Sequence, residues 1–189
     1  MQIYGEKWCR ALKSVLKRLA LDEGYGFLVL IGPDGCGKTD LIRLVIKITE
    51  SSSASDGLRD DDLRKLARLV YQRKYIVVSL KEDTHFSPNI PMRMLNHIFE
   101  TVSHVPVAAG QRFLLTWDDI DSQLDDSVPY HGLNQAFLDE MHRPLALYKY
   151  VTFLVSATHP PGAEGGFLKV SGGPKHFLNL VDSTSPDEE

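Results

Sequence analysis

A candidate phosphate-binding loop lies between residues 32 and 39. Its string Gly-Pro-Asp-Gly-Cys-Gly-Lys-Thr satisfies the pattern G-x-x-x-x-G-K-[ST]. In this pattern backbone N–H groups turn toward a polyphosphate where no side chain obstructs them, and the positive end of the following helix attracts the same anion. We expect Lys38 to bridge the β- and γ-phosphate oxygens and the Thr39 hydroxyl to coordinate Mg²⁺. The predicted nucleotide-binding set is Gly32, Pro33, Asp34, Gly35, Cys36, Gly37, Lys38, Thr39 and Asp40.

Two consecutive acids, Asp118 and Asp119, follow the apolar run 113–117. At the carboxyl end of a strand, the first acid can hold Mg²⁺ and the second can orient an attacking water. We assign these roles to Asp118 and Asp119, respectively. Aspartate is one methylene shorter than the glutamate usual at the second position, so we expect water to be positioned poorly. The acids that follow, Asp121, Asp125 and Asp126, are interpreted as a solvated loop.

Polar residues also follow the apolar run 150–157. Thr158 or His159 could sense the γ-phosphate or orient the water, since both come where that run ends. The other histidines lack the spacing of metal ligands, and no zinc site is predicted. Cys36 has no identifiable base beside it and is interpreted as a small loop filler.

Apolar periodicity predicts the elements that position these residues. Helices are expected over 8–19, 40–48, 60–71, 94–102 and 131–147, and strands over 27–31, 75–80, 113–117, 150–157 and, in a short piece, 177–181. Strands alternating with helices predict the α/β class, with three α/β/α layers and a mostly parallel sheet. The motif at 32–39, between a strand and a helix, makes this a predicted P-loop NTPase fold. The serine-rich stretch 49–57 is expected to be an exposed loop.

Composition narrows the class of protein. The chain has 189 residues, 43% of them hydrophobic and 24% charged, as in a packed domain; we place this domain at 1–182 and an acidic tail at 183–189. A net charge of -4 and a pI near 6.0 do not support independent DNA binding. No apolar run approaches the ~20 residues of a membrane span. Two cysteines suggest a reducing, intracellular compartment.

These motifs, taken in order, resemble the AAA+ ATPases of the origin recognition complex and replication-initiator branch. Residues 3–6 are similar to its N-terminal segment, 32–39 to its Walker A motif, 114–119 to Walker B with Asp for Glu, and 155–159 to sensor 1, with His159 where asparagine is common. The resemblance implies an AAA+ core that takes ATP and Mg²⁺, with other AAA+ subunits as partners. It also implies DNA contact only through the assembly, a nuclear location (cytoplasmic if the family differs) and no membrane.

The chain departs from that family in two ways. Lys169 and Lys175 stand where the family carries arginines, one of which completes a neighbour's ATP site, and lysine cannot make the bidentate contact. The family's helical lid and winged-helix domain do not fit in the residues after Val181. The chain is therefore interpreted as a fragment or a reduced relative without a lid, with weak hydrolysis in isolation.

The sequence is compatible with three functions. The first is an ATP-dependent assembly subunit, in which bound nucleotide favours association. The second is a small P-loop kinase, although beyond Arg112 only Arg143 is available to clamp a transferred phosphoryl group. The third is a nucleotide-binding but inactive scaffold, suggested by Asp119 and His159.

Overall fold

The computed structural model describes residues 5–21, 26–80, 112–118, 150–158 and 175–180. The elements in chain order are α1 (Glu6–Leu21), β1 (Gly26–Ile31), α2 (Lys38–Glu50), the 3-10 turn η1 (Ser52–Ser55), α3 (Asp61–Gln72), β2 (Tyr75–Leu80), β3 (Arg112–Trp117), β4 (Tyr150–Ala157) and β5 (Lys175–Asn179). The helices predicted over 94–102 and 131–147, and the tail 183–189, lie outside the described residues.

The described strands form one five-stranded sheet in the order β2-β3-β4-β1-β5. Every pairing between neighbours is parallel. Strand β4 therefore separates β1, which leads into the glycine-rich loop, from β3, which leads into the acidic pair. The α/β class and the parallel sheet are confirmed. The short last strand runs over Lys175–Asn179, two residues earlier than predicted, because its register with β1 sets its bounds.

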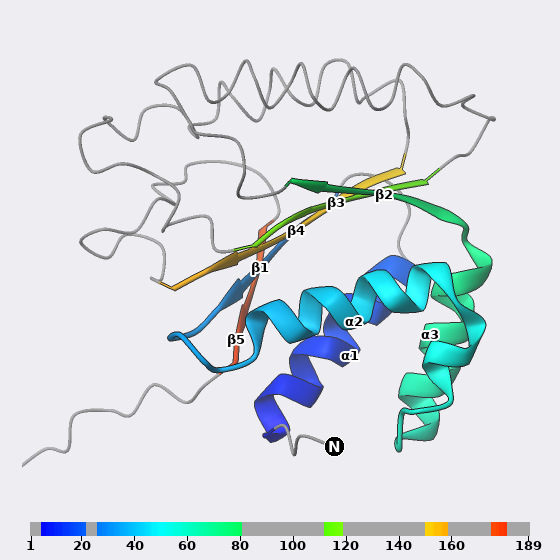
Figure 1. Ribbon diagram of the computed structural model, residues 1–189, viewed down its shortest axis with the longest axis horizontal. Coiled ribbons are helices and arrows are strands. Elements are labelled where there is room, and N and C mark those ends of the chain that lie inside the picture. The colour runs from blue at the N-terminus through cyan, green and yellow to red at the C-terminus, as the bar shows by residue number, and fades with distance from the viewer. Residues whose placement is uncertain (1–4, 22–25, 81–111, 119–149, 159–174, 181–189) are drawn as a thin grey trace, which may run out of the picture.

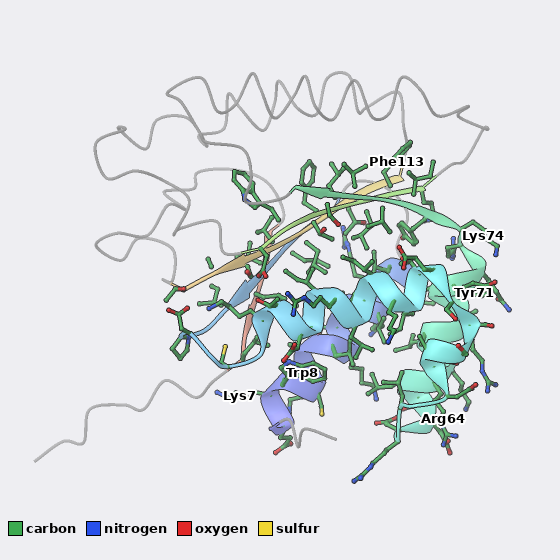
Figure 2. The ribbon with its side chains drawn as sticks, in the orientation of Figure 1. Lys7, Trp8, Arg64, Tyr71, Lys74 and Phe113 are labelled. Carbon is green, nitrogen blue, oxygen red and sulfur yellow. The ribbon has the colours of Figure 1, made fainter. Side chains whose placement is uncertain are left out.

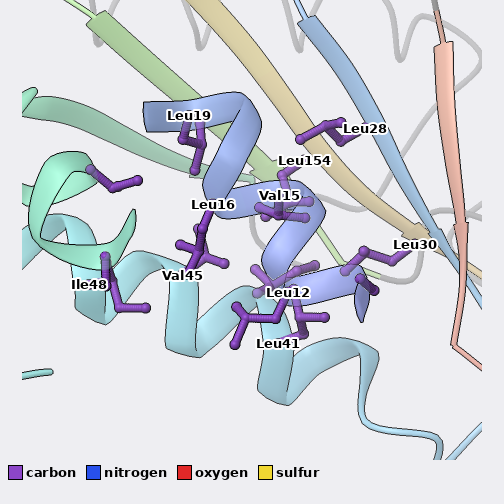
Figure 3. Packing of buried hydrophobic residues seen from close by; sticks show 14 of the residues in the cluster. Leu12, Val15, Leu16, Leu19, Leu28, Leu30, Leu41, Val45, Ile48 and Leu154 are labelled. Carbon is purple, nitrogen blue, oxygen red and sulfur yellow. The ribbon is translucent and has the colours of Figure 1, made fainter. Parts of the chain in front are cut away.

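The three described helices lie together on one face of the sheet (Figure 1). The apolar stripe of α1 packs against both the strands and α2, so that one face of α1 is buried along its length. Figure 3 shows this cluster, in which Leu12, Val15, Leu16 and Leu19 of α1 meet Leu28, Leu30 and Leu154 of the strands and Leu41, Val45 and Ile48 of α2. None of the described helices is long and apolar enough to cross a membrane.

The central strands are buried on both faces of the sheet. In β1, Leu28 and Leu30 belong to the cluster under the helices. Val29, which alternation turns to the opposite face, is also fully buried. Continuous apolar runs of this kind are typical of parallel sheets. The second helical layer of the predicted three-layer arrangement lies outside the described residues.

The serine-rich stretch differs from its prediction as an exposed loop. Helix α2 continues to Glu50, and the 3-10 turn η1 follows at once. Within it the Ser55 hydroxyl donates to the Ser52 carbonyl at 2.8 Å, and Ser55 is buried. Serine favours such local bonds to the backbone, which composition alone cannot distinguish from a solvated loop.

Candidate nucleotide-binding site

The sheet register brings three chain segments to one edge. Ile31 at the end of β1 lies opposite Ala157 of β4, and Val155 of β4 lies opposite Trp117 of β3. The Gly32 amide then donates to the Ala157 carbonyl at 3.3 Å. The glycine-rich loop, Asp118 and Thr158 therefore all leave the sheet at its carboxyl edge, where open α/β sheets bind ligands.

Glycine provides the backbone conformation of the loop. Gly35 and Gly37 have φ values of 79° and 91°, which residues with a Cβ rarely adopt. The Cys36 amide closes the turn 33–36, which contains Gly35, by donating to the Pro33 carbonyl at 3.3 Å. Gly37 is the N-cap of α2 and supplies no side-chain cap. The first turn of α2 thus presents its amides and the positive end of its dipole to the loop, which is the arrangement that binds phosphate.

Lys38 lies inside this loop with only 6% of its surface exposed. Its Nζ donates to the Gly32 carbonyl at 2.5 Å and to the Pro33 carbonyl at 3.3 Å. The same Nζ donates to the Thr158 hydroxyl at 3.3 Å. The carbonyl bonds hold the ammonium over the loop, and Thr158 connects it to the end of β4. The structure therefore brings together Lys38 and Thr158, two of the predicted phosphate-binding residues.

Asp34 places a negative charge in the same group. Its Oδ1 lies 3.6 Å from Lys38 Nζ and accepts a hydrogen bond from the Thr158 hydroxyl at 3.4 Å. The carboxylate is itself 90% exposed, so water screens its charge. The two groups that it contacts, the Lys38 ammonium and the Thr158 hydroxyl, are the ones expected to face a phosphate.

Cys36 fills the space beneath the loop, as predicted. It packs against the main hydrophobic cluster. A Cβ placed on Gly32 would lie 2.6 Å from Cys36 Sγ, closer than any real contact. The position of Cys36 therefore requires glycine at position 32.

Asp118 is held by a neighbouring strand. Ser156 of β4 is fully buried, and its hydroxyl donates to Asp118 Oδ1 at 2.5 Å. The other predicted metal ligand, Thr39, lies in the first turn of α2. Magnesium in nucleotide sites typically takes one or two protein oxygens and completes its shell with phosphate and water. A carboxylate and a hydroxyl are thus a suitable donor set.

Several predicted residues cannot be placed. Asp119, His159 and Lys169 lie outside the described residues, and of Lys175 only the backbone position in β5 is described. The roles assigned to Asp119 and His159 remain predictions.

Two residues were missed as contributors to the site. The sequence places Trp8 only at the start of the predicted helix 8–19, yet its Nε1 donates to the Gly37 carbonyl at 2.9 Å. It places Ser156 only within the predicted strand 150–157 and the segment similar to sensor 1, with no partner for its hydroxyl. A buried indole N–H or hydroxyl needs a hydrogen-bond partner. For both residues the sequence could indicate only this need, from the residue type, and not which atom meets it.

The order of the parallel strands and the loop between β1 and α2 decide the fold class. The chain has the α/β fold of a P-loop nucleotide-binding protein. It matches no family profile. Among curated proteins it is 25% identical over 135 residues to the uncharacterized ABC transporter ATP-binding protein YdbJ of Bacillus subtilis. That alignment covers 68% of this chain and 37% of the relative.

Two solved structures resemble the chain at low identity. The Aeropyrum pernix ORC2 protein, solved as ADPNP and ADP complexes, has a TM-score of 0.47 at 15% identity and matches 95% of this chain and 48% of its own. The PCH-2 protein of C. elegans has a TM-score of 0.43 at 14% identity and matches 90% and 40%, respectively. This chain therefore spans about half or less of each of these three proteins.

Proposed function

We propose that this chain binds ATP with Mg²⁺ at the loop 32–39 and acts as an AAA+ subunit whose assembly depends on the bound nucleotide. The observation that carries the proposal is the buried ammonium of Lys38, held between the loop carbonyls and Thr158 at the carboxyl edge of a parallel sheet. A buried ammonium next to the N-terminus of a helix, whose first amides lack intrahelical partners, fits a polyphosphate.

In this proposal the residues around the loop contact different parts of the bound MgATP. Lys38 neutralises the terminal phosphates, and Thr158 offers a hydroxyl to the same oxygens. The first-turn amides of α2 hold the phosphates nearer the sugar. Thr39 and Asp118 would hold Mg²⁺, which neutralises phosphate charge when it is bound.

The test is thermal unfolding with and without MgATP. Saturation at ~100 times the dissociation constant stabilises a binding protein by about 2.7 kcal/mol. We expect this stabilisation in the wild-type protein and its loss in Lys38→Ala. Lys47→Ala is the matched control, because it removes the same charge from an exposed lysine in the last turn of the same helix. Stabilisation of Lys38→Ala equal to that of the wild type would reject the site.

We infer further that the assembly is of the replication-initiator type. The support is the order of motifs in the sequence. The string from Ile31 to Thr39 and the N-terminal helix resemble subunit 4 of the origin recognition complex. In this proposal the chain is nuclear and reaches DNA only with its partners. Purification from a native extract in ATP and in ADP tests it. Recovery of replication-complex subunits in ATP supports it, and their absence under both conditions rejects it.

We propose that hydrolysis by the isolated chain is weak or absent. The support is chemical: Asp119 is shorter than the usual glutamate, and His159 replaces the common asparagine. A single-turnover assay with and without the recovered partners tests this. Rapid turnover by the chain alone would contradict it.

A further inference from the structure

The indole of Trp8 contacts the backbone where the loop becomes helix α2. Trp8 belongs to the first turns of α1 (Glu6–Leu21) and is 5% exposed. Its Nε1 lies 2.9 Å from the Gly37 carbonyl oxygen. Figure 2 labels Trp8 on α1, below the N-terminal end of α2. A helix distant in sequence from the motif thus bonds to its last glycine.

The Gly37 carbonyl is fixed from two directions. It accepts the Trp8 indole N–H and, at 3.0 Å, the Leu41 amide of α2. These two donors match the two lone pairs of a carbonyl oxygen. Gly37 also has a positive φ of 91°, and glycine without such restraint moves readily between backbone conformations. The indole therefore restrains a glycine that would otherwise move readily between conformations.

The orientation of this carbonyl determines the orientation of an amide. The peptide joining Gly37 to Lys38 is planar and trans, since the described chain contains no cis bond. In such a peptide the C=O and the N–H point in opposite directions. When the carbonyl points toward Trp8 and into α2, the Lys38 N–H points out of the helix start. That amide is one of those offered to the phosphates.

We infer that Trp8 is a positioning residue for triphosphate binding, acting through the Gly37–Lys38 peptide. The inference rests on the proposed function and goes beyond it, because it places part of the phosphate site's organisation in α1. Loss of the indole N–H should weaken the binding of the phosphate chain itself, whatever base or sugar is attached.

The experiment measures the affinity of the full chain for inorganic tripolyphosphate by calorimetry. Tripolyphosphate carries no base or sugar, so it reports on the phosphate cradle alone. Trp8→Phe keeps an aromatic ring and removes the donor, and we expect about fivefold weaker binding, as for one net hydrogen bond. Because Trp8→Phe also removes ring volume, a second variant carries 3-benzothienylalanine at position 8, in which sulfur replaces only the N–H. It should weaken binding equally.

The matched control is Leu19→Val, which loosens the same helix where it packs away from the loop. Leu19 is fully buried near the end of α1, so this variant should unfold at a lower temperature and still bind tripolyphosphate like the wild type. Wild-type affinity in both position 8 variants would overturn the inference and leave the proposed function standing. Equal weakening by Leu19→Val would also overturn it, as the effect would be one of general stability. No binding by the wild type would overturn the proposed function and the inference with it.

Discussion

The hydroxyl of Ser156 donates a hydrogen bond to the carboxylate of Asp118 across two adjacent parallel strands, at 2.5 Å. Ser156 is fully buried, so its hydroxyl cannot exchange this partner for bulk water at little cost. A carboxylate held in this way keeps one oxygen occupied and the direction of the other fixed. Such support by a neighbour is typical of metal ligands.

Ser156→Ala should therefore weaken the use of Mg²⁺. We expect the Mg²⁺ concentration at half-maximal stabilisation by ATP to rise about tenfold, as for the loss of other groups that orient a metal ligand. Stabilisation by tripolyphosphate without Mg²⁺ should not change. Thr116→Val is the control, since it removes a buried strand hydroxyl bonded to Ser79. An unchanged Mg²⁺ dependence in Ser156→Ala would show that the bond does not orient a ligand.

Asp34→Asn should bind triphosphate more tightly than the wild type. The carboxylate lies 3.6 Å from Lys38 Nζ and accepts from Thr158, so it competes with phosphate for both groups and repels its charge. We expect a gain of about fivefold, the size of one charge contact in high dielectric, and a smaller gain at high salt. Calorimetric titration with MgATP measures it.

The control for this change is Asp56→Asn. It removes the same charge beyond the other end of α2, where Asp56 lies 3.9 Å from Arg68. If both variants gain equally, net charge explains the effect; if Asp34→Asn gains nothing, the carboxylate does not compete.

Gly32→Ala should lower the free energy of unfolding by about 1–3 kcal/mol, the usual cost of overpacking. The new methyl group would meet Cys36 Sγ at 2.6 Å. The same change in a Cys36→Ala background should cost much less. Gly35→Ala is the comparison, because it meets nothing within 4 Å and is strained only by its φ of +79°, so Cys36→Ala should not rescue it. Denaturant unfolding of the single and double variants measures all of these, and equal costs in both backgrounds would exclude the steric explanation.

Asp60→Ala should destabilise the protein at neutral pH and much less in acid. The Asp60 carboxylate caps α3 by accepting from the Asp62 and Leu63 amides at 2.7 and 3.1 Å. These bonds, the Leu63 amide foremost, hold the pKa of Asp60 below its ordinary value. The stabilisation is therefore complete above the ordinary pKa of the unfolded chain and disappears as pH falls through the lower pKa of the folded protein.

The measurement is the difference in unfolding midpoint between this variant and the wild type, from neutral pH down to about 3. Asp61→Ala is the control, because the exposed Asp61 side chain pairs with the half-buried Arg64 in the same first turn. A difference for Asp60→Ala that stays constant with pH would contradict a charged cap.

Local sequence determined much of this molecule. Helix α1 could be predicted because its apolar residues recur at helical spacing, and strand β1 because it is a short continuous apolar run. The loop between β1 and α2 could be predicted from the spacing of its glycines, Lys38 and Thr39. The predicted place of Asp118 also followed from local order, since a polar residue directly after a buried strand must emerge at its end.

The tertiary structure decided which of these residues meet. Nothing in the spacing of Trp8 and Gly37, or of Ser156 and Asp118, reveals a hydrogen bond between them, because each bond joins elements brought together by helix packing or strand order. Likewise the sequence places Asp34 in the phosphate-binding loop, but its contact with Thr158 depends on β4 lying beside β1. Periodicity specifies which face of an element is buried, whereas the partner of a buried polar atom depends on the path of the whole chain.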